Sequence, residues 1–142
     1  MNLVVAEDRP RRDIAAIALS RRCAARLWSR SQFRPEDVSL ACLYDGFTHI
    51  TISWLEALGL CPIGEFGNWV DGGKRIGPGG SMPLNPHGGQ LTEGRMHGLA
   101  HVTEAVSQLR GQSGVRQVPN ACVAAVSNAH GPQTGAMILY TD

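Results

Sequence analysis

Residues 38–47 read VSLACLYDGF, and this stretch decides the fold that the rest of the chain completes. Its first seven residues are almost continuously apolar, which is typical of a strand buried on both faces of a sheet that helices cover. Small and polar residues then interrupt the run, and apolar residues recur at helical spacing over 47–58, with Gly59 placed to end a helix. We therefore expect a strand over 38–44 that leads directly into a helix.

The segments on either side extend this pattern. Over 10–29, apolar residues recur three and four positions apart with arginines between them, which predicts an amphipathic helix. A similar stripe predicts another helix over 94–110, and two apolar runs at 121–127 and 135–141 predict strands of an antiparallel hairpin. The order of the elements predicts an α/β fold, a layered domain with a mixed sheet covered by helices.

Residues 62–93 have no clear periodicity and hold most of the glycine. Glycine pairs and a Gly-Pro-Gly-Gly run in this segment favour turns and close backbone approach. Such a long stretch without regular structure inside a compact domain is usually functional or disordered. Apolar anchors such as Trp69 and Leu84 favour an ordered, functional loop.

The composition limits the class of protein. The chain has 142 residues, a net charge of +1 and 43% hydrophobic residues, as expected of one globular domain over 1–142 that binds neither nucleic acid nor an anionic membrane. We expect no membrane span and no signal peptide, because the apolar runs are too short. The cysteines are Cys23, Cys42, Cys61 and Cys122. They form no CxxC pair, which favours reduced core residues in a cytoplasmic protein.

Three motifs occur in the order found in the C-terminal domain of thiolases. They are YDGF at 44–47, NPHGG at 85–89 and QLRGQSGVRQV at 108–118. Over 35–142 the chain resembles the sterol-carrier-protein branch of that family and the bacterial lipid-transfer-type acyl-coenzyme A lyases of steroid degradation. The resemblance implies a thiolase-like C-terminal half, with 62–93 as a glycine-rich active-site loop. It also implies a coenzyme A thioester as substrate and no bound cofactor.

The resemblance also indicates which chemistry is missing. Thiolase reactions need a nucleophilic cysteine and a second base, and in the family the cysteine that is acylated lies in the N-terminal half. Where the family has a Gly-His-Pro histidine, this chain has Arg95. The C-terminal hairpin has Ser127 and Asn128 but no cysteine, and Cys122 lies too early in its strand. Ordinary thiolase activity is therefore not expected.

Tyr44 and Arg95 are the candidate catalytic residues. The lipid-transfer-type lyases use a tyrosine at the position of Tyr44 for retro-aldol cleavage of acyl-coenzyme A side chains, and a phenol beside a cation can accept the β-hydroxyl proton. Those lyases carry a second tyrosine where this chain has Arg95, a cation able to stabilise an enolate oxygen. The alternatives are a packed core tyrosine for Tyr44, and a salt bridge or a coenzyme A contact for Arg95.

A second set of residues is expected to bind the substrate. They are Asp45, Asn85, His87, Gly88, Gly89 and His130. Asp45 either caps the helix that follows it, which we favour, or accepts hydrogen bonds from the glycine-rich loop. Asn85 and the two glycines shape the loop that meets the thioester. His87 and His130 lie on loops, where they either line the site or are surface side chains.

His97 and His101 lie one helical turn apart, a spacing that can bind zinc. No third ligand is evident in the sequence at a convincing distance, so we predict no metal site.

Two classes of function follow from these observations. In the first, the chain is part of an enzyme that acts on acyl-coenzyme A in an oligomer or hetero-oligomer, with an N-terminal thiolase half, an OB-fold protein of the DUF35 type, or both. In the second, it is a non-catalytic acyl-coenzyme A-binding or assembly module, or a truncated thiolase remnant. The replaced histidine and the absent cysteine favour the second class.

Overall fold

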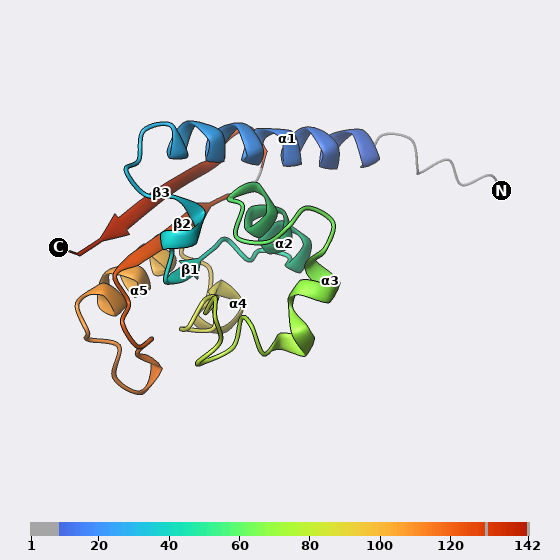
Figure 1. The fold of residues 1–142 in the computed structure, drawn as a ribbon. Helices are drawn as coiled ribbons and strands as arrows, with labels where there is room; N and C mark the ends of the chain where they lie inside the picture. Colours follow the sequence, from blue (N-terminus) through green and yellow to red (C-terminus); the bar gives the residue numbers. More distant parts are fainter. Residues whose placement is uncertain (1–8, 130, 142) are drawn as a thin grey trace.

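A three-stranded sheet lies at the centre of the computed structural model, which describes residues 9–129 and 131–141 (Figure 1). The strands are β1 (Leu40–Cys42), β2 (Val123–Asn128) and β3 (Gly135–Tyr140), in that order across the sheet. β1 pairs with β2 in parallel, and β2 pairs with β3 antiparallel. The predicted α/β fold, mixed sheet and antiparallel hairpin are therefore confirmed.

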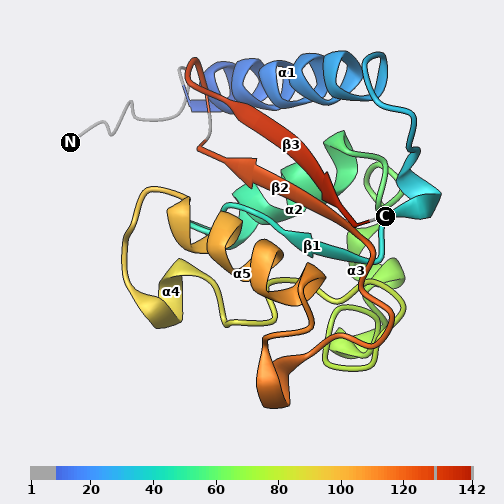
Figure 2. The same cartoon turned by 90° about the vertical axis from the view of Figure 1, so that its left-hand side faces the viewer.

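Helices cover both faces of this sheet. The α-helices are α1 (Arg9–Trp28), α2 (Thr48–Ala57), α3 (Phe66–Trp69), α4 (Gln90–Glu93) and α5 (Leu99–Leu109). Short 3₁₀ turns occur at Pro35–Asp37, Asp71–Gly73 and Gly114–Arg116. α1 packs along β3 and α2, while α5 packs against β1 and β2 from the other side (Figure 2). Among the described residues, no helix is long and apolar enough to cross a membrane.

The apolar run around β1 divides its side chains between two cores. Leu40 and Cys42 pack in the cluster on the α5 side, whereas Ala41 and Leu43 pack with Trp54 in the larger cluster on the α2 side. All five side chains are fully buried. Because neighbouring residues of a strand face opposite sides of the sheet, a nearly continuous apolar sequence is what this strand needs, as we predicted.

The glycine-rich segment is ordered, and its end lies along the free edge of β1. The N–H of Ala41 donates to the Pro83 carbonyl at 2.9 Å, and the N–H of Asn85 donates to the Ala41 carbonyl at 2.8 Å. Leu84 thereby forms a parallel β-bridge with Ala41. This pairing brings the 85–89 motif to the same end of the sheet as Tyr44.

Two element boundaries differ from the sequence prediction. β1 is shorter than the predicted strand over 38–44, because Leu43 and Tyr44 form hydrogen bonds to side chains instead of a neighbouring strand. The predicted helix over 94–110 begins only at Leu99. Gly94 and Gly98 have φ of 95° and 87°, in the left-handed region that ends or delays a right-handed helix.

The QLRG motif has a structural role. Gln108 is buried, and its Nε2 donates to Glu104 Oε1 at 2.7 Å and to the Arg116 carbonyl at 2.8 Å. Its Oε1 accepts the N–H of Val118 at 2.8 Å. One side chain therefore ties the end of α5 to the segment that enters β2.

We expect Gln108→Leu to lower the free energy of unfolding by about 2–4 kcal/mol, because it leaves Oε1 of the buried Glu104 and the N–H of the buried Val118 without their hydrogen-bond partner. Urea denaturation measures this change. Gln112→Leu is the matched control, since Gln112 is exposed and surface substitutions usually change stability by less than ~0.5 kcal/mol. Equal effects of the two substitutions would contradict this role of Gln108.

Candidate functional site

A cavity of about 230 Å³ opens where β1 ends. Its lining residues are Tyr44, Gly46, Phe47, Gln90, Leu91 and Arg95. Tyr44 comes from the strand end and Arg95 from the loop after α4, so the two predicted catalytic side chains lie on the wall of one cavity although they are far apart in sequence. Arg95 is exposed and Tyr44 is half-buried.

Two hydrogen bonds hold the backbone of Tyr44 in place. Its N–H donates to the Ser127 hydroxyl at the end of β2, at 3.1 Å, and its carbonyl accepts the hydroxyl of Thr51 on α2, at 3.2 Å. Gly46 lies under the phenol ring, so a Cβ at this position would come within 2.8 Å of the Tyr44 hydroxyl. The turn after β1 therefore needs glycine to leave room for the ring.

Asp45 joins the end of β1 to the glycine-rich loop. Its carboxylate is buried, and Oδ1 accepts the N–H of Gln90 at 3.1 Å. α2 begins after Phe47 without a side-chain cap, so the helix cap that we favoured from sequence is wrong. A hydrogen bond from the loop fixes Asp45 instead, because a buried carboxylate needs donors that can replace water.

Gly89 allows the loop to approach Asp45 closely, and Gly88 leaves room for the side chain of Thr92. Gly88 and Gly89 have φ of 89° and 68°, and a Cβ at Gly89 would overlap the Asp45 carboxylate. Gly89 precedes α4, whose first residue, Gln90, is held by Asp45. The glycine pair therefore places α4, and with it one wall of the cavity, against the strand end.

Asn85 uses both ends of its amide on the backbone of Leu43. Its Oδ1 accepts the N–H of Leu43 at 2.7 Å, and its Nδ2 donates to the Leu43 carbonyl at 2.9 Å. Asn85 itself has φ of 45°, a conformation that asparagine tolerates better than most residues. The structure thus places this predicted substrate-binding residue as a brace for the strand end.

Two buried histidines lie behind Asp45. Nε2 of His101, on α5, lies 3.3 Å from Asp45 Oδ1, outside hydrogen-bond alignment. The ring of His87 meets that of His101 edge-on at 5.2 Å, and its Nε2 lies 4.0 Å from Glu93. Burial lowers the pKa of His101, with Asp45 opposing the shift. Of the two alternatives for His87, the surface side chain is therefore wrong.

In the sequence, the one notable feature of His101 is its spacing to His97, which can bind zinc. His97 is exposed, precedes α5 and has φ of 49°. The two histidines therefore do not lie on successive turns of one helix. No group of three or more His, Cys, Asp or Glu side chains in the described ranges is arranged to hold a metal ion. The contact of His101 with Asp45 joins α5 to the end of β1, and no sequence motif predicts it.

The cysteines offer no activated thiol at the site. Burial is the main cause that raises the pKa of both Cys42 and Cys61, so these thiols are not thiolate nucleophiles at neutral pH. All four cysteines are free, as predicted, but Cys122 is exposed, so a core position is wrong for that residue. His130, also predicted to bind substrate, lies outside the described residues.

Comparisons with known proteins agree with this architecture. The model of the family described as thiolase C-terminal domain-like matches residues 7–140. The chain is 42% identical over 113 residues to 17-hydroxy-3-oxo-4-pregnene-20-carboxyl-CoA lyase of Mycobacterium tuberculosis, covering 80% of this chain and 29% of that protein. It is 41% identical over 125 residues to sterol carrier protein 2 of Oryctolagus cuniculus, covering 86% of this chain and 23% of that protein.

A solved structure is similar as well. The Ltp2-ChsH2(DUF35) aldolase superposes with a TM-score of 0.80 at 36% identity, over 87% of this chain and 32% of that chain. The chain therefore spans less than a third of the length of these relatives.

We expect Gly89→Ala to be more costly than Gly79→Ala. Gly79 shares a positive φ of 77° but has no atom within 4 Å of an added Cβ, so its substitution should cost about 1–2 kcal/mol from backbone strain. At Gly89 the overlap with Asp45 should add about 1–3 kcal/mol. Chemical denaturation of both variants measures the difference.

A double-mutant cycle separates the overlap from backbone strain. If the Asp45 carboxylate is the obstacle, Gly89→Ala should cost less in an Asp45→Ala background than in the wild type. The same cost in both backgrounds would show that the close packing of Gly89 on Asp45 is energetically unimportant.

Proposed function

The chain belongs to the thiolase C-terminal domain-like family, and from that premise we propose that it forms part of an enzyme that cleaves a carbon–carbon bond in lipid acyl-coenzyme A esters. The membership confirms the resemblance predicted from the motifs. A lyase of a steroid carboxyl-CoA and a DUF35-containing aldolase are among the similar proteins, and their names favour a retro-aldol reaction on a steroid or other lipid side chain.

The observation that carries the proposal is the meeting of Tyr44 and Arg95 on one cavity wall. In a retro-aldol reaction a base removes the proton of the β-hydroxyl group. The O–H electrons form the new carbonyl, the bond between the α and β carbons breaks, and its electrons form the enolate of the thioester. That enolate then takes a proton at the α carbon, so the step needs no oxidant or reductant.

Each side chain has one proposed role in this reaction. Tyr44 accepts the hydroxyl proton at its phenol oxygen and can return it to the α carbon. Arg95 lines the same cavity, and its guanidinium stabilises the negative charge on the enolate oxygen. Asp45, Gly88 and Gly89 position the loop that joins the two side chains. The coenzyme A thioester binds in the cavity as substrate, and the proposed reaction uses no bound cofactor.

The size of the cavity supports a composite site. At about 230 Å³ it is smaller than the ~300–1,000 Å³ typical of pockets that enclose small ligands, and an acyl-coenzyme A is a large ligand. We therefore propose that another polypeptide, such as an N-terminal thiolase half or a DUF35-type OB-fold protein, supplies the remaining walls in a cytoplasmic hetero-oligomer.

A second candidate function is an acyl-coenzyme A-binding or assembly module without catalysis. Arg95 in place of the family histidine favours it, because a catalytic group of the family is replaced there. The raised pKa values of the buried Cys42 and Cys61 thiols exclude thiolase chemistry on them, whereas a retro-aldol reaction needs no thiol. Binding of acyl-coenzyme A without turnover would distinguish this function from lysis.

We expect the chain, combined with the polypeptides encoded beside it, to cleave a 3-hydroxyacyl-coenzyme A whose β carbon carries the hydroxyl group. Tyr44→Phe should lower kcat/KM by about 10²–10⁴-fold, as for loss of a general base. Arg95→Gln should lower it by about 10²-fold through loss of charge stabilisation. Chromatography of the released ketone and the shortened thioester measures the rates.

Tyr140→Phe is the matched control, because it removes the hydroxyl of the other tyrosine, which lies at the end of β3 outside the cavity. Its rate should equal that of the wild type. Wild-type rates for Tyr44→Phe would refute the role of Tyr44 as base. Calorimetric binding of the thioester without any turnover would instead favour the non-catalytic module.

A further inference from the structure

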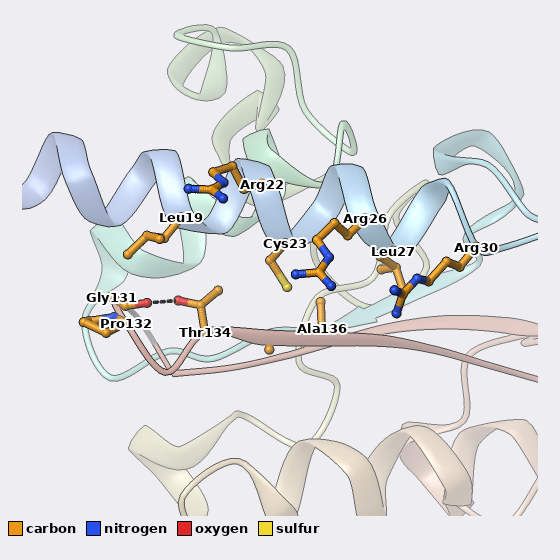
Figure 3. Close-up of a pocket in the computed structure, with 11 residues that line it drawn as sticks. Leu19, Arg22, Cys23, Arg26, Leu27, Arg30, Gly131, Pro132, Thr134 and Ala136 are labelled. Carbon is orange, nitrogen blue, oxygen red and sulfur yellow. Dashed lines mark hydrogen bonds between the residues drawn. The ribbon is translucent and has the colours of Figure 1, made fainter.

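A groove separate from the candidate site runs between α1 and β3. It consists of two adjoining cavities of about 430 and 380 Å³ that share Leu27 and Arg30. The first cavity begins at the turn before β3 and reaches Ala136, and the second continues to Tyr140. The groove therefore follows the whole length of β3. Figure 3 shows the first cavity, with α1 on one side and β3 on the other.

One wall of this groove is basic and its floor is apolar. Arg22 and Arg26 lie on α1, Arg30 lies two residues beyond its end, and the apolar lining includes Leu27 of α1 and Ala136 of β3. Of the described residues that line the two cavities, none is acidic. Among the described residues, none of the three arginines belongs to an ion pair. Three arginines without ion-pair partners beside an apolar surface indicate a partner that has both acidic and apolar side chains.

The groove also lies along an unpaired strand edge. β3 is the outer strand of the sheet, and within residues 9–129 and 131–141 only β2 pairs with it. Alternate residues of such a strand direct N–H and carbonyl groups outward. A second peptide backbone satisfies that alternation of donors and acceptors by adding a strand. Nucleic acids and lipid headgroups offer anions but no matching row of donors and acceptors.

The spacing of the arginines fits an added strand. Residues four apart on a helix rise by ~6 Å, and side chains on one face of a strand repeat every ~7 Å. Carboxylates at successive positions on one face of a strand beside β3 would therefore meet Arg22 and Arg26 in turn, with Arg30 just beyond the end of α1. The intervening side chains would face the other side of the sheet, where Met137 is exposed.

We propose that this groove binds an extended segment of a partner chain that carries acidic residues at alternate positions and pairs with β3 as an additional strand. The proposal does not depend on the catalytic function. A second copy of this chain is disfavoured as occupant, because antiparallel pairing of two β3 edges would place two rows of arginines side by side. Like charges at that distance repel one another.

The test uses the full chain and three fluorescein-labelled peptides that alternate valine with glutamate, glutamine or lysine over seven residues. Fluorescence anisotropy should give a Kd for the glutamate peptide roughly tenfold or more below that of the glutamine peptide. The lysine peptide should not bind. Amide hydrogen exchange should slow within 135–140 when the glutamate peptide is bound, because the outward N–H groups gain acceptors.

The substitution pair R22Q/R26Q removes two cations from the groove, and R21Q/R110Q removes two cations that do not line it. The first pair should weaken binding of the glutamate peptide by roughly tenfold, and the second should leave it unchanged.

Three results would overturn the proposal. The first is equal affinity for all three peptides, and the second is binding without protection of β3. The third is protection of β3 amides before any peptide is added. In that case size-exclusion chromatography and removal of residues 1–8 would identify a second copy, or the chain's own leading segment, as the occupant.

Discussion

The buried carboxylate of Asp45 is the constraint on which the candidate site depends. It lies at the end of β1, accepts the N–H of Gln90 and has His101 at 3.3 Å behind it. Removing a carboxylate from water is costly unless donors replace the lost hydration. The loop must therefore lie against the end of β1 to supply a donor. Gly89 permits this close packing because it has no side chain, whereas a Cβ there would overlap the carboxylate.

Both walls of the cavity follow from this contact. Tyr44 precedes Asp45 in sequence and is held by Ser127 on the neighbouring strand, while Arg95 follows the short helix that begins at Gln90. Asn85 braces the same strand end through Leu43. The fold thus brings Tyr44 and Arg95 to the lining of one cavity.

The sequence predicted the layers of the fold well, because each depends on a local pattern. The run from Val38 to Tyr44 requires burial on both faces, and the structure divides its side chains between two cores. Contacts between distant segments were not predictable in this way. For Asp45 the favoured helix cap, a local contact, is wrong, and the structure has the alternative, a hydrogen bond from the loop at Gln90. The contact of His101 with Asp45 has no local pattern that could predict it.

The exchange rate of one amide proton tests the central role of Asp45 most directly. Gln90 is only half-buried, so its hydrogen bond to Asp45, rather than burial, should protect its N–H. Residue-resolved hydrogen exchange by NMR should find this amide protected in the wild type and exchanging at least roughly tenfold faster in Asp45→Ala. Equal exchange in the two proteins would contradict the account, because the loop would then hold its position without the carboxylate.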